Sequence, residues 1–316
     1  MKKLKIIVWS LSLSLMINIL FVSCAENSNN KNSWYFKNMT ISKLWEYSEG
    51  ESQTIAFIDT GISDELYYQL KDNIVFSYNV IESNDNVSDI HGHGTEMVSV
   101  ACGNGYKGIY GIAPKAKIII VKAVSDEGKT NNNYLYKALK LANDNGATIV
   151  NISLGGYKSD NKVINQINSM VSKNISIVAA AGDYQNKDLL FPANQTNIIS
   201  VEACTKKNII WEESNYNENS IMRMPGTDID VLTLHDNSLV KDKANGTSQA
   251  ASITSGYISI IRDYYIKHNI PFDNTFLIKT LQLMCTKNNT SVDYLTPLKN
   301  NPPYPLTFAS HCAKIK

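Results

Sequence analysis

Apolar runs of strand length recur along the middle of the chain, and segments with helical periodicity separate several of them. The runs are rich in β-branched residues and cover Thr54–Ile58, Lys117–Ala123, Ala147–Ile152, Ile175–Ala181 and Asn197–Ala203. The intervening segments 134–142 and 163–171 carry apolar residues three and four positions apart, which predicts amphipathic helices. Strands that alternate with helices predict an α/β fold with a central parallel sheet flanked by helices on both faces.

The length of the chain favours one large domain. With 316 residues and 43% hydrophobic residues, it can bury a sizeable core. Without residues 1–23, which hold three of the 30 basic residues and no acidic ones, 27 basic and 29 acidic residues remain, a net charge of −2. A nearly neutral body offers no electrostatic basis for binding nucleic acid, so we expect no nucleic-acid partner.

The N-terminus has the pattern of a targeting segment. Three lysines among the first five residues precede an apolar run of 17 residues, Ile6–Val22, as in a signal peptide. "FVSC" at positions 21–24 resembles a bacterial lipobox, so residues 1–23 are expected to be a lipoprotein-type signal peptide, Cys24 the lipidated residue and 24–40 a linker. The alternative is an uncleaved anchor, since 17 residues are just enough to span a bilayer. Either topology places the body outside the cytoplasm, tethered to the outer face of the cell membrane.

The other four cysteines are predicted to behave differently from Cys24. Cys102 and Cys204 lie inside apolar patterns, which is typical of buried thiols. Cys285 and Cys312 are the one pair for which a disulfide is worth testing.

Three residues suggest nucleophilic catalysis when they are taken together. Asp59 ends the first predicted strand, His93 follows 34 residues later, and Ser248 comes 155 residues after His93. Separately they are compatible with an Asx turn, a core histidine and the start of a helix. Together they provide a nucleophile, Ser248, a base that works near neutral pH, His93, and a carboxylate that orients the base, Asp59.

The motifs around these residues resemble those of the subtilisin-like serine peptidases, the subtilases. "IDTGI", "HGT", "VNISLGG", "AAAG", "MPG" and "NGTS" all stand in family order between about residues 45 and 261, and the chain order Asp, His, Ser is that of the family. The resemblance implies a three-layer subtilisin-like fold, with a peptidase domain over 41–285 and a C-terminal extension over 286–316. It also implies a peptide or protein substrate and no cofactor, apart from structural calcium whose ligands the motifs do not identify.

A metal-dependent hydrolase is the alternative interpretation among the hydrolases. His91 and His93 could form half of a metal site, but the sequence has no HExxH motif and no third-ligand pattern. We therefore expect no catalytic metal.

The resemblance also implies where a peptide would bind. The expected substrate-binding residues are Gly128, Ser153, Leu154, Gly155, Ala181 and Leu190. The segments around 128–130 and 153–156 would hold an extended peptide between them through main-chain hydrogen bonds. Ala181 would line the wall of the S1 pocket and Leu190 would lie near its floor, which predicts a shallow, apolar pocket. Asp126 and Glu127 lie next to the expected upstream subsites. They are either a solvated pair of charges or groups that favour a basic side chain of the substrate there.

Two departures from the family pattern affect the expected activity. Asp183 stands where the family commonly has an Asn that donates a hydrogen bond to the oxyanion. An ionised Asp183 would face the developing negative charge, whereas a buried and protonated one could donate; we expect slowed or retuned catalysis. Gln249 and Ser252 replace the usual Met and Pro, and "GTSQA" is typical of the lantibiotic and bacteriocin leader peptidases.

The expected function is thus an extracytoplasmic serine endopeptidase of a Gram-positive bacterium that removes the leader from a lantibiotic precursor. A general or signalling subtilase is the alternative within the same class. A catalytically impaired subtilase-fold binding protein is the alternative from another class. Only 34 residues separate Cys24 from Asp59, so we expect no large prodomain.

Overall fold

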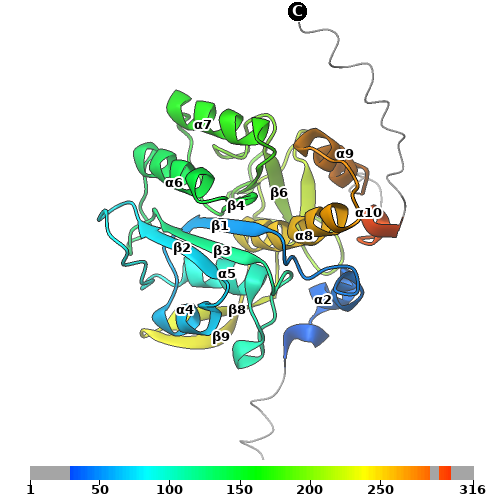
Figure 1. The fold of residues 1–316 in the computed structure, drawn as a ribbon, viewed down its shortest axis with the longest axis horizontal. Helices are drawn as coiled ribbons and strands as arrows, with labels where there is room; N and C mark the ends of the chain where they lie inside the picture. Colours follow the sequence, from blue (N-terminus) through cyan, green and yellow to red (C-terminus); the bar gives the residue numbers. More distant parts are fainter. Residues whose placement is uncertain (1–28, 285–291, 300–316) are drawn as a thin grey trace, which may run out of the picture.

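The computed structural model describes residues 29–284 and 292–299, and its central element is a parallel sheet (Figure 1). Seven strands of the described residues pair in the order β2-β3-β1-β4-β5-β6-β7, all in parallel. They are β1 (Thr54–Asp59), β2 (Ile74–Asn79), β3 (Lys117–Lys122), β4 (Ile149–Ile152), β5 (Ser176–Ala180), β6 (Ile199–Cys204) and β7 (Met222–Pro225). A separate antiparallel hairpin joins β8 (Ile229–His235) to β9 (Ser238–Ala244).

Helices cover both faces of the sheet. Those of the described residues are η1 (Asn30–Asn32), α2 (Trp34–Asn38), α3 (Ile41–Leu44), α4 (Asp64–Leu70), α5 (His93–Cys102), η2 (Tyr106–Gly108), α6 (Asn132–Asp144), α7 (Asn161–Ser172), α8 (Thr247–Lys267), α9 (Asn274–Met284) and α10 (Thr296–Lys299). α6 and α7 lie on one face, and α5 and the long α8 lie on the other (Figure 1). This confirms the predicted α/β architecture of a parallel sheet between helical layers.

The central strands read as unbroken apolar runs because both of their faces are buried. Successive side chains of a strand point to opposite faces, and in β1 Ile55 and Phe57 join the core beneath α5 and α8. Ala56 and Ile58 join the second core, beneath α6 and α7. The predicted strands agree with β1, β3, β4, β5 and β6 to within two residues at each end.

The segments that the hydrophobic pattern did not single out lie at the margins of the sheet. β2 and β7 are its two outer strands, and β2 keeps several partly exposed side chains. The hairpin partner β9 is mostly exposed and carries alternating charges, whereas β8 is buried against α5. Ser99 Oγ accepts the Leu232 N–H at 3.0 Å and so ties α5 to β8.

The described part of the predicted linker, 29–40, is folded against the domain. Tyr35, Phe36 and Met39 are buried in the core that contains α8, and the Trp34 indole donates to the Thr227 carbonyl oxygen at 3.0 Å. The folded domain therefore includes residues 29–40, because these apolar side chains are buried in its core.

The described part of the predicted C-terminal extension, 292–299, also packs on the domain. Tyr294 and Leu298 are buried, and the Tyr257 hydroxyl of α8 donates to the Tyr294 carbonyl oxygen at 2.7 Å. Cys102 and Cys204 are buried thiols, as predicted.

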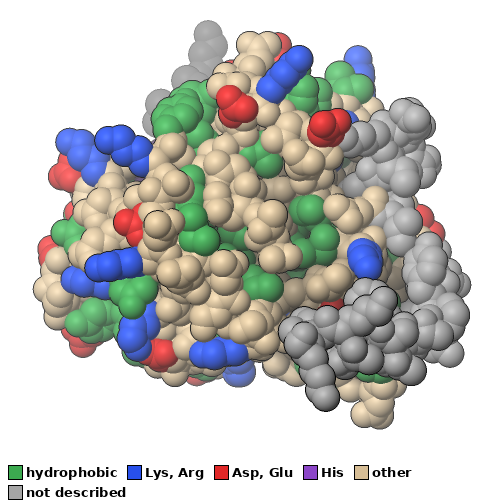
Figure 2. All heavy atoms as spheres, turned by 90° about the horizontal axis from the view of Figure 1, so that it is seen from above, with side chains coloured by type: hydrophobic (Ala, Val, Ile, Leu, Met, Phe, Trp, Pro, Cys, Tyr) green, Lys and Arg blue, Asp and Glu red, His purple; other side chains and the backbone are tan. Residues whose placement is uncertain are grey.

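The predicted signal peptide, Cys24, Cys285 and Cys312 lie outside the described residues. Within 29–284 and 292–299, none of the helices combines the length and the apolar character needed to cross a membrane. Figure 2 shows one face of the molecule, where basic and acidic side chains are interspersed around a centre of hydrophobic and uncharged groups.

Candidate active site

Asp59 and His93 form a direct pair at the carboxyl end of β1. Asp59 is the last residue of the strand, where the carboxyl ends of a parallel sheet converge. Its Oδ1 lies 2.7 Å from His93 Nδ1 and accepts the Thr60 N–H at 2.8 Å. The Asp59 side chain is only 3% exposed, and its other oxygen is buried without a hydrogen-bond partner in the described structure. One carboxylate oxygen thus fixes the imidazole through Nδ1.

Asp89 shapes the loop that presents His93, a role that the sequence motifs had not indicated. Asp89 Oδ1 accepts the Gly92 N–H at 2.9 Å, and Oδ2 accepts the N–H and the hydroxyl of Thr95 at 3.0 and 2.6 Å. Gly92 precedes α5 with a φ of +94°, a left-handed conformation that favours glycine. An Asp four residues before the His, with a Thr two residues after it, is the local signal for this arrangement.

The surroundings of His93 favour its protonated form. Burial of the imidazole opposes protonation, but the charge of Asp59 and its hydrogen bond, with smaller effects from Glu96 and Asp89, outweigh burial and raise the pKa of His93 to about 9. The principal cause of the increase is a carboxylate at hydrogen-bond distance, which stabilises an imidazolium. The same contact suits a base that must become positively charged during a reaction.

Ser248 lies in the first turn of α8, which begins after Gly246. Its hydroxyl donates to the Ser153 carbonyl oxygen at 3.2 Å, and the Ser153 hydroxyl donates to the Ser248 carbonyl oxygen at 3.3 Å. Beneath them the Asn151 amide donates to Ser153 Oγ and accepts from the Ser255 hydroxyl, both at 2.8 Å. The end of β4 is therefore joined to α8 at Ser248 and again two turns later at Ser255.

Asp183 follows the end of β5 and also reaches the start of α8. Its Oδ1 accepts the backbone N–H of Thr247 at 2.9 Å and the Thr247 hydroxyl at 2.7 Å. Its Oδ2 lies 3.2 Å from the position that a Cβ on Gly246 would occupy. The side chain is exposed, so the burial that our argument for a protonated Asp183 assumed is not found. Asp183 acts here as a hydrogen-bond acceptor.

Asn215 organises the loop that carries Asp183, and sequence motifs gave no signal for it. This fully buried side chain accepts the N–H groups of Tyr184 and Asn186 at 2.9 and 3.1 Å. Its amide donates to the Asp188 carbonyl oxygen at 2.9 Å, and its backbone N–H donates to the Gly182 carbonyl oxygen at 2.7 Å. The side chain of Asn215 thus holds in place a loop that has no helix or strand of its own.

Leu190 fills the space between two of the predicted substrate-binding segments. A Cβ on Gly155 would lie 2.8 Å from Leu190 Cβ, and one on Gly182 would lie 2.8 Å from Leu190 Cγ. The Leu190 N–H donates to the Ala181 carbonyl oxygen at 3.0 Å, and its side chain is buried. Leu190 therefore occupies the gap between the loop after β4 and the loop after β5.

The loop on the other side of the expected peptide position carries Gly128. It is an exposed turn residue with a φ of +71°, and a Cβ there would lie 3.3 Å from His91 Nε2. The rings of His91 and His93 meet edge-on, with centroids 6.3 Å apart. Of the two acidic residues in this loop, Asp126 and Glu127, Asp126 forms an ion pair with Lys122 at 2.6 Å. Nowhere in 29–284 and 292–299 do three or more His, Cys, Asp or Glu side chains group to hold a metal ion.

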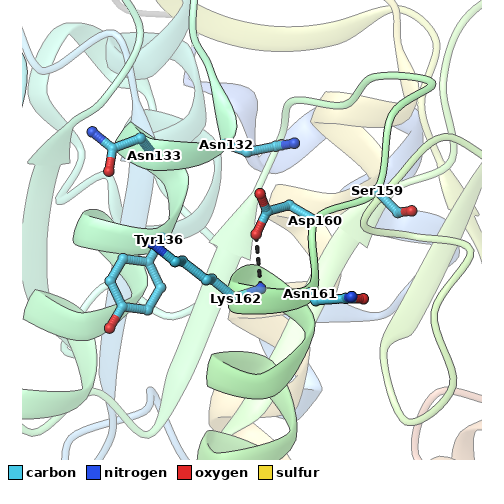
Figure 3. Close-up of a pocket in the computed structure, with 7 residues that line it drawn as sticks. All are labelled: Asn132, Asn133, Tyr136, Ser159, Asp160, Asn161 and Lys162. Carbon is cyan, nitrogen blue, oxygen red and sulfur yellow. Dashed lines mark hydrogen bonds between the residues drawn. The ribbon is translucent and has the colours of Figure 1, made fainter.

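A polar pocket lies between the starts of α6 and α7. It has a volume of about 490 Å³ and is lined by Asn132, Asn133, Tyr136, Ser159, Asp160, Asn161 and Lys162. Figure 3 shows the dashed hydrogen bond from the Lys162 N–H to the Asp160 carboxylate, which caps α7. None of the residues that line this pocket belongs to the group around Ser248.

The sequence was compared with protein families and with known proteins. The sequence model of the Subtilase family matches residues 50–283. The thermophilic serine proteinase of Bacillus sp. (strain AK1) is 30% identical over 228 residues, which cover 71% of this chain and 56% of that protein. The minor extracellular protease Epr of Bacillus subtilis (strain 168) is also 30% identical, over 75% of this chain and 36% of Epr. The chain thus spans about half or less of the length of these two relatives.

Solved structures share the fold. A cold adapted subtilisin-like serine proteinase superposes with a TM-score of 0.66 at 22% identity, over 76% of this chain and 85% of the other. The prenylagaramide maturation protease PagA superposes with a TM-score of 0.68 at 23% identity, over 83% and 92% of the two chains. With a family match over most of its length and this fold, the chain belongs to the subtilase family.

Proposed function

We propose that the chain is a serine endopeptidase in which Asp59, His93 and Ser248 form the catalytic triad. The observation that carries the proposal is the 2.7 Å contact between His93 Nδ1 and Asp59 Oδ1, on the same edge of the sheet as the start of α8. Asp59 holds the imidazole with the proton on Nδ1, so Nε2 is the nitrogen that accepts a proton. Membership of the family supports the assignment.

In the proposed reaction the Ser248 hydroxyl first leaves the Ser153 carbonyl oxygen, to which it donates here. His93 Nε2 takes the hydroxyl proton as Ser248 Oγ attacks the peptide carbonyl, and Asp59 stabilises the imidazolium that forms. His93 then gives the proton to the leaving amine as the C–N bond breaks, and a water that His93 deprotonates hydrolyses the acyl group from Ser248. An extended peptide that donates its own N–H to the Ser153 carbonyl would displace the hydroxyl, which links substrate binding to activation of the nucleophile.

The oxyanion would form at the start of α8. The N–H of Ser248 is among the first four of the helix, which have no acceptor within the helix, and the positive end of the helix dipole favours negative charge there. Asp183 occupies the position of the second donor but presents a carboxylate whose Oδ1 accepts from Thr247. We therefore expect a weaker oxyanion site than one with a neutral amide.

Peptide recognition is proposed to use main-chain pairing with the segments around Gly128 and around Ser153, Leu154 and Gly155. Beside them Ala181 is fully buried in the core, and Leu190 fills the gap near Gly155. A pocket filled in this way favours a small side chain, such as Ala or Gly, on the residue that precedes the cleaved bond.

Labelling with a fluorophosphonate probe tests the peptidase proposal. The purified body of the chain, residues 25–316, should become covalently labelled, and Ser248→Ala should abolish the labelling. Ser153→Ala, which removes a neighbouring hydroxyl, serves as the control for labelling at another serine. A wild-type chain that folds but takes up no label would instead favour the catalytically impaired binding protein, for which the carboxylate of Asp183 is the supporting observation.

We propose removal of a leader from a modified peptide precursor, such as a lantibiotic precursor, as the physiological reaction. Support comes from "GTSQA" around Ser248, and PagA, named as a maturation protease, shares the fold. Deleting the gene should leave the mature peptide of the same strain attached to its leader, as seen by mass spectrometry of the culture. Processing that continues without the gene would favour a general or signalling subtilase.

We propose that the enzyme works outside the cytoplasm on a lipid anchor at Cys24. The signal-like segment and "FVSC" at its end support this location. Labelled palmitate should be incorporated into the wild-type chain and not into Cys24→Ala. If the variant stays in the membrane fraction without a lipid, the apolar run is an uncleaved anchor.

A further inference from the structure

Glu96 lies one turn beyond His93 in α5 and has no part in the reaction proposed above. Its partly buried carboxylate accepts hydrogen bonds from two other elements. Oε1 accepts the Thr233 hydroxyl of β8 at 2.8 Å, and Oε2 accepts the amide of Gln249 in α8 at 2.9 Å. One carboxylate therefore joins the helix of the general base, the helix of the nucleophile and the hairpin.

Gln249 is the residue immediately after Ser248, and its orientation depends on Glu96. The side chain is 3% exposed, and its carbonyl oxygen is buried without a hydrogen-bond partner in the described structure. A Cβ on Gly246 would lie 2.5 Å from that oxygen. An unpaired buried carbonyl is costly, so the hydrogen bond from the amide to Glu96 is the polar contact that holds this side chain in place.

The carboxylate of Glu96 also interacts electrostatically with His93. His93 and Asp59 interact with its charge, while β8 and α8 contribute the uncharged Thr233 and Gln249. Burial raises the pKa of Glu96, an increase that His93 and the two hydrogen bonds oppose. Asp89 and Asp59 are the other carboxylates that act on His93. Among these acids Glu96 is the one that is also bonded to the nucleophile's helix.

We propose that Glu96 is a positioning residue of the peptidase: its carboxylate holds the start of α8 in place through Gln249 and places a negative charge one turn from His93. The inference rests on the proposed roles of His93 and Ser248. Gln249 and Glu96 are 153 positions apart, and they form one unit in which a polar residue beside the nucleophile needs a carboxylate one turn after the base.

The rate of fluorophosphonate labelling, measured from pH 5 to pH 10, tests the inference. In Glu96→Gln the charge is lost while the side chain keeps its length, so protonated His93 loses an attractive partner. The acid limb of the profile should move to lower pH by about 0.5 to 1 unit. Thr233→Val removes a hydrogen bond and keeps the charge, so its acid limb should stay at the wild-type pH.

Glu96→Asp separates position from charge, because the shorter carboxylate keeps the charge and cannot reach Gln249 in the same geometry. Labelling should slow at every pH, with the acid limb close to that of the wild type. Circular dichroism checks that each variant is folded. A folded Glu96→Gln whose acid limb is unmoved, or moves to higher pH, would overturn the inference. A wild-type chain that does not label at Ser248 would instead contradict the proposed function itself.

Discussion

Asp183 presents one oxygen to Thr247 and leaves the other beside Gly246. An asparagine at this position could keep both accepted hydrogen bonds at its own Oδ1. Its NH₂ would then stand where Asp183 Oδ2 stands, next to the start of α8. At the scale of a single residue, replacing Oδ2 of Asp183 by an NH₂ group would therefore give the proposed site a neutral donor for the oxyanion.

Asp183→Asn should raise kcat for a chromogenic peptide at neutral pH about 10-fold or more, because one such donor is worth about 10² to 10³ in this family. Asp183→Ala, which removes the carboxylate without supplying a donor, is the matched control and should not show the full gain. An unchanged or slower Asp183→Asn would mean that the carboxylate has another role.

We expect Leu190 to set a second property of the proposed site, the size of the side chain that is accepted before the cleaved bond. Leu190→Gly should raise kcat/KM for a substrate with Phe at that position, relative to Ala, by about 10-fold or more, since filling an apolar pocket yields about 10 to 200-fold for each methylene-sized difference. Paired substrates that differ only in this residue provide the measurement. An unaltered ratio would show that the side chain binds elsewhere.

At the scale of elements, Thr247 links the end of β5 to the start of α8. Its hydroxyl donates to Asp183 and accepts the N–H of Gly182 at 3.1 Å. The link resembles a helix cap supplied from a neighbouring strand, in which Asp183 Oδ1 satisfies the first free N–H of α8. The loop after β5 is thereby fixed to the start of α8.

Thr247→Val should lower the free energy of unfolding by about 1 to 2 kcal/mol, because it leaves buried polar groups unpaired. Thr247→Ser keeps the hydroxyl and should lose less than half of that amount. Urea unfolding of both variants in a Ser248→Ala background avoids self-cleavage. A larger loss in Thr247→Ser than in Thr247→Val would assign the effect to packing of the threonine methyl group, which valine keeps.

Some parts of the fold and of the candidate site can be predicted from the sequence, and others cannot. Central strands such as β1 are predictable because burial on both faces leaves an unbroken apolar run. β9 is not, since its exposed, charged residues resemble a loop. Asp59, His93 and Ser248 stand in motifs of their own. The pairing of Glu96 with Gln249 depends on tertiary packing across 153 positions, and no local pattern reports it.

For the molecule as a whole, stability and activity are expected to respond to pH in opposite directions. The pKa of His93 in the folded chain is about 9, above its ordinary value of about 6.5. Its contribution to the free energy of unfolding is therefore fully present below about pH 6.5 and is lost as the pH rises through about 9. Catalysis needs the neutral imidazole, so activity increases over the same interval.

In the Ser248→Ala background, His93→Gln should unfold at a lower temperature than its parent at pH 6, and the two should converge by pH 10. We expect a difference of about 1 to 3 kcal/mol at pH 6, since a raised pKa is worth ~1.36 kcal/mol per unit and partial exposure reduces it. Calorimetry at several pH values measures the convergence. A difference that stays constant with pH would mean that His93 stabilises the fold by packing alone.

The parallel sheet brings together residues that are far apart in the sequence, such as Ile55 of β1 and Ile149 of β4. Contacts of this kind slow folding, and Ser248 comes 189 positions after Asp59 in the sequence. In a refolding solution, endopeptidase molecules that fold early would meet chains that are still unfolded. Unfolded chains are the forms that proteases cut. If the proposed function holds, self-digestion should grow with concentration and limit the yield of the active chain, and the Ser248→Ala chain should escape this limit.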